Sequence, residues 1–112
     1  MADCIFCKIG NGDFNTEFLY EDNDFVAFND IEPQAPTHIL VITKNHIESV
    51  SKSKNSEEEL VGKLLIVAKK VCEKLNISDY RLVINNGAGA GQEVMHIHLH
   101  ILSGRDFSWP PG

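Results

Sequence analysis

The pattern of apolar and polar positions predicts one long amphipathic helix in the middle of the chain. Residues 56–59, Ser-Glu-Glu-Glu, have the form of a capping box and place acidic groups in the first turn, where the helix dipole favours them. Lysines gather toward the other end, and Asn76 is expected to stop the helix. Between these ends apolar residues recur at helical spacing, at Leu60, Val61, Leu64, Leu65, Val67, Ala68, Val71, Cys72 and Leu75.

Shorter apolar runs have the β-branched or aromatic composition of strands. A polar hairpin-type turn separates the first two runs, and Pro33 and Pro36 exclude a regular element before the third. A short helical turn is expected before Gly10. The pattern is that of an α+β domain, with antiparallel strands and the long helix on one face. The predicted strands occupy residues 18–20, 25–28, 38–43, 80–85 and 94–102.

Composition narrows the class of protein. A chain of 112 residues and 12.5 kDa predicts a single domain over residues 1–112. Ten Lys and Arg against 16 Asp and Glu give a net charge of −6, which argues against binding to nucleic acid or an anionic membrane. No apolar run approaches the roughly 20 residues that span a bilayer. The first residues lack a signal-peptide pattern, and three cysteines are an odd count for a disulfide framework, so we expect a cytoplasmic protein.

Three histidines alternate with apolar residues in the last predicted strand. Because successive side chains of a strand point to opposite faces, His96, His98 and His100 would share one face, spaced roughly 7 Å apart. Ile97, Leu99 and Ile101 would then pack against the helix. The histidines admit three interpretations: a solvated polar face, a zinc site, or nucleophilic and acid–base chemistry at phosphorus or carbonyl carbon.

A loop of small residues, Gly-Ala-Gly-Ala-Gly over 87–91, precedes the histidine strand. By itself it could be a plain flexible connection. Small residues also let the backbone approach a ligand closely, and successive N–H groups can form an anion-binding nest. A strand follows the loop instead of a helix, which excludes the dinucleotide-binding and P-loop motifs. The loop therefore favours phosphate chemistry at the neighbouring histidines.

The order His-Ile-His-Leu-His-Ile-Leu over residues 96–102 resembles the signature of the histidine triad (HIT) family. The likeness extends through residues 28–38, Gly91-Gln92 and the Trp-Pro-Pro-Gly ending over 109–112, and it is similar to the Hint branch, the histidine triad nucleotide-binding proteins. His100 sets the chain apart from the dinucleotide hydrolase branch, which usually has Gln there. The resemblance implies a HIT-like fold with a five-stranded antiparallel sheet, one long helix and a short N-terminal helix. It also implies a homodimer with a continuous ten-stranded sheet.

The same resemblance implies hydrolysis of purine nucleoside phosphoramidates, such as AMP joined to an amine, with an AMP- or GMP-like nucleotide bound. His98 matches the nucleophile that forms a nucleotidyl-histidine intermediate. His100 and His38 match histidines that contact phosphate and organise the proton network, and His96 completes the catalytic set. Asp30 matches a carboxylate that binds the ribose hydroxyls, a task that suits charge-assisted hydrogen bonds. The other matches are Ile31 at the base pocket, Asn85, Gly91 and Gln92 at the phosphate and leaving group, and Trp109 near the partner's site.

Simpler interpretations stay open for some of these residues. Asp30 could begin a turn, Trp109 could pack the tail, and His38 could be a hydrogen-bonded core histidine. Glu93 stands beside the expected leaving group, where some Hint proteins have Ser, and its carboxylate would favour cationic amines. Met95, where Tyr is frequent, is assigned only a packing role.

Cys4 and Cys7 form a C-x-x-C pair near the start of the chain. A redox pair would need a βαβ context, which the predicted elements lack, and two ordinary apolar cysteines are the plain alternative. A structural zinc site would need two further ligands. The resemblance points to His46 and His96, because some bacterial members and related nucleotidyl transferases pair such a motif with two histidines. We therefore expect one structural zinc per subunit, and none is needed for the chemical step.

The predicted function is a nucleoside phosphoramidase that acts through His98. A nucleotide-binding or interaction module with weak incidental hydrolysis is the competing class, because its pocket would look the same. A zinc-storage or metal-sensing protein that uses all five histidines is a third class. The apolar residues between the histidines and the small-residue loop argue against it.

Overall fold

The computed structural model describes residues 3–112. A short helix α1 (Ile5–Gly10) is followed by strands β1 (Tyr20–Glu21), β2 (Phe25–Asn29) and β3 (Thr37–Thr43). A 3₁₀ turn (Asn55–Glu57) leads into the long helix α2 (Glu58–Lys74). Strand β4 (Arg81–Val83), a second 3₁₀ turn (Ala88–Ala90) and strand β5 (His98–Ser103) complete the regular structure. Within the described residues no helix is both long and apolar enough to cross a membrane.

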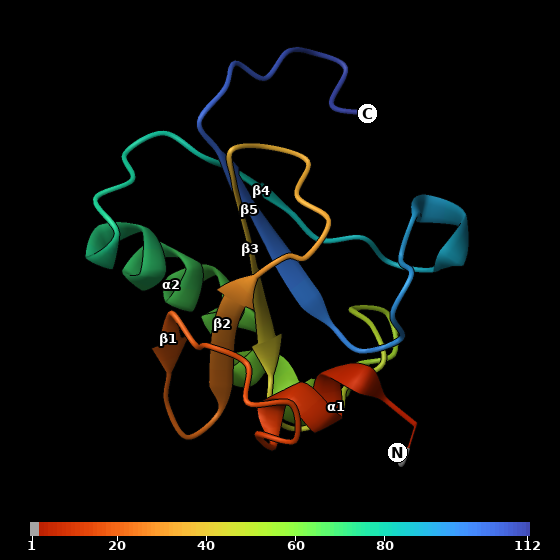
Figure 1. Ribbon diagram of the computed structural model, residues 1–112. Helices are drawn as coiled ribbons and strands as arrows, with labels where there is room; N and C mark the ends of the chain where they lie inside the picture. The colour runs from red at the N-terminus through yellow and green to blue at the C-terminus, as the bar shows by residue number, and fades with distance from the viewer. Residues whose placement is uncertain (1–2) are drawn as a thin grey trace.

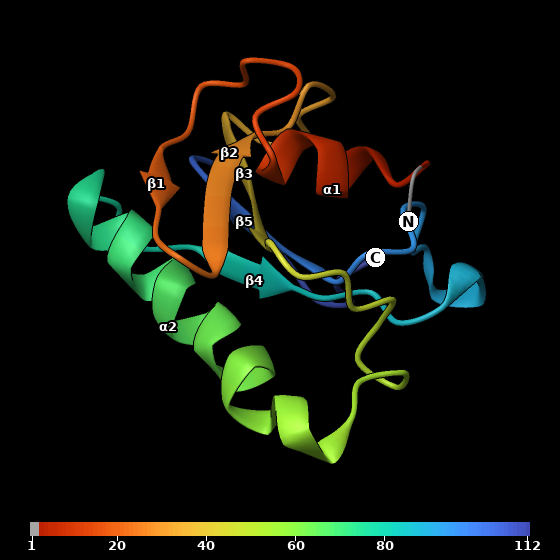
Figure 2. The same cartoon turned by 90° about the horizontal axis from the view of Figure 1, so that it is seen from below.

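The strands form one antiparallel sheet in the order β1-β2-β3-β5-β4. Helix α2 covers one face of the sheet, and α1 lies against the other (Figures 1 and 2). Strands β3 and β5 are neighbours at the centre, and β1 and β4 form the two edges. The predicted α+β class is confirmed, with a five-stranded antiparallel sheet, one long helix and a short N-terminal helix.

Alternation along the central strands divides the apolar core into two clusters. Side chains on one face of the sheet, among them Phe25, Ile39 and Val41, pack under α2. Ile97, Leu99 and Ile101 belong to the same cluster, which confirms their predicted contact with the helix. Side chains on the opposite face pack with Phe6 of α1; they are Val26, Phe28, Leu40 and Ile42. His98 pairs with Ile42 and His100 with Leu40 across the sheet. The register therefore places both histidines on the α1 face.

Helix α2 confirms the strongest sequence pattern, with a change at its start. Ser56 lies within the 3₁₀ turn that precedes the helix, so it does not cap α2. The Glu57 carboxylate instead accepts a hydrogen bond from the backbone N–H of Lys54 at 2.7 Å. At the other end the helix stops at Lys74, and Asn76 follows with a left-handed φ of 58°. Asn76 therefore lies just beyond the helix, close to its predicted stop.

The last strand begins later than the apolar pattern predicts, at His98 and not at residue 94. The backbone N–H of His96 donates to the carbonyl of Val94 at 2.9 Å, and that of Ile97 donates to the carbonyl of Ile47 at 2.7 Å. These bonds turn the chain before it enters the sheet. The prediction that the strand includes His96 is therefore wrong, although the His96 ring contacts Phe6 of α1 as the His98 ring does.

Candidate functional site

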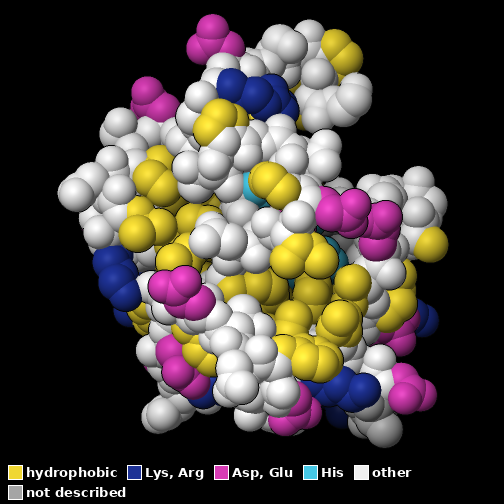
Figure 3. Space-filling view, in the orientation of Figure 1, with side chains coloured by type: hydrophobic (Ala, Val, Ile, Leu, Met, Phe, Trp, Pro, Cys, Tyr) yellow, Lys and Arg dark blue, Asp and Glu magenta, His cyan; other side chains and the backbone are white. Residues whose placement is uncertain are grey.

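A cavity of about 270 Å³ opens on the α1 face of the sheet, and His98 and His100 line it from β5. Its apolar wall includes Phe6, Phe28 and Leu40, and its polar lining includes Asp30 and Glu93. Figure 3 shows histidine atoms at the surface among hydrophobic side chains on this face. An apolar slot with a few polar groups suits a flat ring that carries a polar extension.

His98 is buried, and its Nδ1 lies 2.7 Å from the backbone carbonyl oxygen of His96. Because a carbonyl oxygen can only accept, Nδ1 carries the proton and Nε2 keeps its lone pair. Burial lowers the pKa of His98 below its ordinary value of 6.5, so the ring is neutral near pH 7. A neutral imidazole held in this tautomer is able to act as a nucleophile.

His38 and His100 form a directed chain of hydrogen bonds beside His98. The backbone N–H of Gln34 donates to Nδ1 of His38 at 3.0 Å, so His38 carries its proton on Nε2. That proton is donated to Nδ1 of His100 at 2.9 Å. A neutral His100 then carries its own proton on Nε2, and burial lowers its pKa to about 4, which keeps it neutral.

Nε2 of His100 is buried and has no hydrogen-bond partner in the part of the chain that the structure describes. A buried donor without an acceptor costs free energy, roughly 1–3 kcal/mol. His100 lines the cavity, so an oxygen of a bound ligand could satisfy this N–H group. The chain from Gln34 through His38 thus orients His100 as a hydrogen-bond donor.

The contacts of Asp30 agree with both interpretations of its position, a turn-forming residue and a carboxylate at a binding site. Its Oδ1 accepts a hydrogen bond from the backbone N–H of Glu32 at 2.9 Å, which is a turn-forming contact. Its Oδ2 lies 3.4 Å from Nε2 of His38, and the residue also lines the cavity. The carboxylate is therefore held in place at the cavity wall. Ile31 follows it in the lining and is 94% exposed.

Donor atoms of Asp30, His38 and His100 also lie within 4.8 Å of one another, as in some metal sites. The hydrogen bond from Gln34 occupies the Nδ1 lone pair of His38, so a proton lies on the Nε2 atom that a metal would need. We therefore interpret this group as a chain of hydrogen bonds that orients His100.

The small-residue loop approaches the cavity at Gly91, whose φ of 94° is in the left-handed region that glycine adopts readily. Asn85 donates from Nδ2 to the carbonyl of Gly91 at 3.4 Å and does not itself line the cavity. Glu93 lines both this cavity and a wider neighbouring hollow of about 510 Å³, which also contains Met95. A group that leaves the phosphate past Glu93 would meet a carboxylate.

Gln92 lies behind the cavity, where its side chain is only 3% exposed. Its Oε1 accepts from the backbone N–H of Gly87 at 2.8 Å. Its Nε2 donates to the carbonyls of Glu48 at 2.8 Å and Val94 at 3.0 Å. The amide therefore holds the shape of the loop, and contact between Gln92 and a nucleotide stays a prediction.

Trp109 lies in the C-terminal tail, 84% exposed and away from the cavity lining. The tail is attached near β4, where the Arg81 guanidinium donates to the carbonyl of Ser108 at 3.1 Å. Phe107 lies under the guanidinium groups of Arg81 and Arg105, at 5.1 and 4.2 Å. Within this chain Trp109 contributes nothing to the cavity, so its predicted role depends on a partner subunit.

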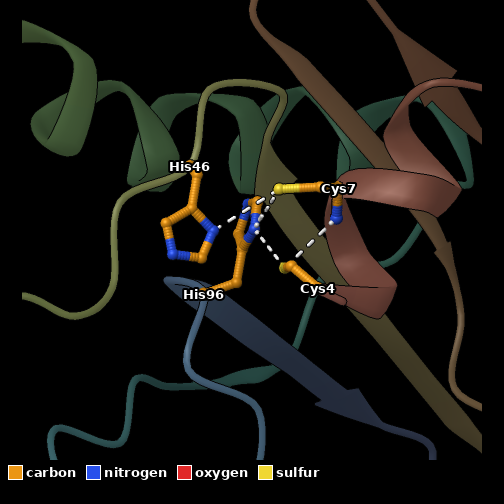
Figure 4. Close-up of side chains that lie close together, drawn as sticks. All are labelled: Cys4, Cys7, His46 and His96. Atoms are coloured by element: carbon orange, nitrogen blue, oxygen red, sulfur yellow. Dashed lines mark hydrogen bonds between the residues drawn. The ribbon is translucent and has the colours of Figure 1, made fainter. Parts of the chain in front are cut away.

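A second cluster gathers the four residues predicted to bind zinc (Figure 4). Cys4 and Cys7 come from the start of α1, His46 from the segment after β3, and His96 from the segment before β5. One possible ligand atom from each lies within 4.8 Å of the others. Sγ of Cys4 is 3.2 Å from Nδ1 of His96, and Sγ of Cys7 is 3.4 Å from Nδ1 of His46. Zinc bonds of about 2.0–2.3 Å in a tetrahedron give nitrogen–sulfur separations of about 3.5 Å, so the donor set fits.

His96 is fully buried, and its tautomer suits a metal ligand. Its Nε2 lies 2.7 Å from the carbonyl oxygen of Thr43, so Nε2 carries the proton and the Nδ1 lone pair faces the two sulfurs. A backbone acceptor behind the ligating ring is typical of metal-binding histidines. His96 does not line the cavity, but its carbonyl accepts the hydrogen bond that orients His98.

The thiol of Cys7 argues against a redox role for the pair. Burial, followed by the neighbouring Cys4, raises the pKa of Cys7 to about 11. Thiols that exchange disulfides have lowered pKa values, because the thiolate is the reactive form. The raised pKa argues against a thioredoxin-like function, and the support for metal binding comes from the four donor atoms that lie close together.

Sequence reasoning missed three groups that shape the two sites. Phe6 lines the cavity from α1, and only its place between the two cysteines could have drawn attention to it. The backbone N–H of Gln34 and the carbonyl of Thr43 set the tautomers of His38 and His96. Backbone groups of this kind carry no sequence signal, because every residue has a carbonyl and nearly every residue has an N–H.

The fold and the sites define a small α+β protein with a histidine-lined cavity beside a possible metal cluster. A family model described as the HIT domain matches residues 11–107. This match covers most of the chain, and the protein therefore belongs to the HIT family.

Relatives extend the likeness to nearly the full length. An uncharacterized HIT-like protein from Synechocystis sp. is 50% identical over 98% of this chain and 97% of its own. The crystal structure of a HIT family hydrolase from Legionella pneumophila has 47% identity and a TM-score of 0.92, covering 98% of this chain and 100% of that one. A histidine triad protein from Clostridium difficile has 39% identity and a TM-score of 0.91, with 96% of each chain covered. A histidine triad nucleotide-binding protein from Candida albicans has 31% identity and a TM-score of 0.79, covering 96% of this chain and 83% of that one.

Proposed function

We propose that this protein is a Hint-branch hydrolase, a single domain that cleaves the P–N bond of purine nucleoside phosphoramidates. The observation that carries the proposal is the fixed tautomer of His98 at the cavity wall, which presents Nε2 as a neutral nucleophile. The names of similar proteins support it, since one is a HIT family hydrolase and another a histidine triad nucleotide-binding protein.

The nucleotide is expected to bind with its base in the apolar part of the cavity, against Phe28 and Leu40. Asp30 then accepts hydrogen bonds from the ribose hydroxyls, and the phosphate lies next to His98, His100 and Gly91. The buried N–H of His100 donates to a phosphate oxygen, which supplies the partner that this group lacks.

The reaction proceeds in two displacements at phosphorus. Nε2 of His98 forms a bond to phosphorus, the bond to the amine breaks, and the amine leaves with a proton supplied by solvent. Water then attacks the phosphorus, releases one proton and frees His98. Each turnover thus consumes one water and yields a nucleoside monophosphate and an amine.

The test is a fluorogenic AMP–amine substrate with the wild type and His98→Ala. We expect the variant to lose turnover by on the order of 10⁴-fold, because the intermediate cannot form. Binding of AMP, measured by calorimetry, should remain close to wild type. Retained turnover in His98→Ala would reject the mechanism. Nucleotide binding by a wild type without turnover would support the binding-module alternative.

The proposal includes one structural zinc per subunit, bound by Cys4, Cys7, His46 and His96, whose donor atoms fit a tetrahedral site. The zinc supplies a fixed joint between α1 and the segment before β5, and it takes no part in the chemical step. Zinc measured by elemental analysis at one equivalent per chain would support it, and metal-free active protein would oppose it.

A homodimer is also proposed, with β4 as the joining edge. Within residues 3–112, strand β4 pairs in the sheet with β5 alone, so its outer backbone groups are available to a second copy. Pairing of two β4 strands would give a continuous ten-stranded sheet. Sedimentation of the intact protein tests this assembly, and a monomer at micromolar concentration would contradict it.

A further inference from the structure

Helix α1 takes part in both sites at once. At its start Cys4 and Cys7 belong to the four-residue metal cluster. Ile5, Phe6 and Ile9 of the same six-residue helix line the cavity proposed for the nucleotide. Any shift of α1 that follows metal binding or release therefore changes the cavity wall.

Phe6 provides direct contact between the two sites. Its ring meets the ring of His98 edge-on, with centroids 5.1 Å apart and an interplanar angle of 80°. It meets the ring of His96, the buried member of the metal cluster, at 5.9 Å and 78°. Phe6 is itself buried, so these contacts are part of a packed cluster. Displacement of Phe6 would change the packing of both His98 and His96.

A second connection runs through the backbone of His96. Its ring faces the sulfurs of Cys4 and Cys7, while its carbonyl accepts the hydrogen bond from Nδ1 of His98. The residue that would bind the metal thus also holds the ring proposed as nucleophile. Metal binding fixes the His96 ring and, through the same residue, the carbonyl that orients His98.

Helix α1 depends on external contacts for its order. It has six residues, and isolated helices shorter than about 12–15 residues are marginal in water. A metal ion that joins Cys4 and Cys7 to His46 and His96 anchors the helix to the rest of the fold. A ligand that needs an ordered α1 then has less conformational entropy to lose when it binds.

We propose that metal at the Cys4–Cys7–His46–His96 cluster and nucleotide in the cavity strengthen each other's binding through α1 and Phe6. The inference rests on the proposed function, which supplies both ligands. The metal site is thereby more than a structural joint, because its occupancy sets the affinity for nucleotide. Since coupling of two binding equilibria is reciprocal, nucleotide must tighten the metal by the same factor.

The test measures how each ligand changes the affinity for the other, with AMP and Zn²⁺ as probes. Calorimetry gives the Kd of AMP for zinc-loaded and for metal-free protein, after circular dichroism has shown that both are folded. Competition with a chromophoric chelator gives the Kd of zinc with and without saturating AMP. We expect zinc to lower the Kd of AMP by about 5-fold or more, and AMP to lower the Kd of zinc by the same factor.

Phe6→Leu, with Phe14→Leu as its control, tests whether the coupling passes through α1. Phe6 is buried between the two sites, whereas Phe14 is 55% exposed and lines neither cavity. We expect Phe6→Leu to reduce the coupling factor toward one while it still binds one zinc. Phe14→Leu should keep the wild-type factor. An unchanged factor in Phe6→Leu would overturn the assigned route.

A measurement on metal-loaded protein covers the case in which the metal-free chain unfolds. Protein loaded with Co²⁺ is mixed with excess chelator, and the loss of the cobalt–thiolate absorption is followed with and without AMP. We expect AMP to slow the loss several-fold in the wild type, and less in Phe6→Leu. Equal rates with and without AMP would overturn the proposal.

The outcomes separate this inference from the function on which it rests. Protein that binds no AMP, or no zinc, would refute the proposed function together with the coupling. Protein that binds both, with Kd values that do not depend on each other, would refute only the coupling.

Discussion

At the scale of single residues, backbone groups decide what each histidine can do. The carbonyl of His96 fixes His98 with its lone pair on Nε2, and the carbonyl of Thr43 fixes His96 with its lone pair on Nδ1. The N–H of Gln34 fixes His38 as a donor to His100. Chemically identical side chains are thus held in different tautomers, which suit the nucleophile, the metal ligand and the hydrogen-bond donor that we propose.

His100 provides a pH test of this arrangement. Burial, followed by His98 and His38, lowers its pKa to about 4, and Asp30 opposes the shift. Between about pH 6.5 and pH 4 the unfolded chain binds a proton at this residue that the folded chain does not. The free energy of unfolding should therefore fall as the pH is lowered through this window, by up to about 1.4 kcal/mol per pH unit from this group.

Urea unfolding at pH 7 and pH 5 measures the effect in the wild type and in His100→Gln. The variant lacks this titrating group, so the difference between the two proteins reports on His100 together with its contacts to His38 and His98. We expect the wild type to lose more stability than the variant on going to pH 5. An equal loss in both proteins would show that the folded state does not lower the pKa of His100.

At the scale of elements, periodic segments were predictable and junctions were not. The apolar spacing of α2 and the runs in β2 and β3 define those elements because burial on one side repeats regularly along them. The start of β5 has the same alternating pattern as the strand itself, yet the chain turns there to carry His96 to the cysteines. The N–H of Ile97 donates to the carbonyl of Ile47, 50 positions earlier, and a contact between residues so far apart in sequence leaves no local pattern.

Most of the proposed site residues could be identified from the sequence, whereas the direction of one side chain could not. His98, His100 and Asp30 were identified from the motif, and the structure places all three at the cavity. The four residues of the metal cluster were also named from the sequence, and the structure brings them together. The side chain of Gln92 is directed to the loop instead, since three backbone groups of the loop satisfy its amide.

Gly104 tests the junction between β5 and the segment that precedes β3. Its φ is +96°, and a Cβ at this position would lie 2.8 Å from Cβ of Pro36. Gly104→Ala must therefore strain the backbone and displace Pro36, which is close in sequence to Gln34 and His38. We expect a loss of about 1–3 kcal/mol in the free energy of unfolding, measured in urea.

Gly62→Ala is the matched control, because Gly62 lies in the exposed part of α2 and a Cβ there meets nothing within 4 Å. Alanine is the better helix former, so this variant should gain about 0.5–1 kcal/mol. Similar stabilities for Gly104→Ala and the wild type would show that the contact with Pro36 relaxes freely.

At the scale of the whole molecule, the metal cluster links the two ends of the sequence. Cys4 and His96 are separated by 92 positions, and their donor atoms lie 3.2 Å apart. A bond between such distant residues restricts the unfolded chain, and a loop of roughly 100 residues corresponds to about 4–5 kcal/mol in the chain-entropy description of a covalent cross-link. Because a metal can dissociate from the unfolded chain, its actual contribution is set by the affinity of the folded protein for the metal and by the free metal concentration.

Removal of the metal should therefore lower the melting temperature substantially, which thermal unfolding with and without a zinc chelator measures. Cys7→Ser should contain less zinc and respond weakly to the chelator. Cys72→Ala is the control, because Cys72 lies on the buried side of α2 and outside the cluster. It should keep one zinc and the full response. A chelator that leaves the wild-type transition unchanged would argue against a metal in the folded protein.

The four residues of the metal cluster lie far apart in the sequence, so the ribosome exposes them at different times during synthesis. Cys4, Cys7 and His46 emerge early, and His96 follows 50 positions after His46. A nascent chain therefore offers three donors for a long interval before the fourth arrives together with β5. Firm retention of zinc would then mark completed translation of the domain, and products of premature termination would release the ion.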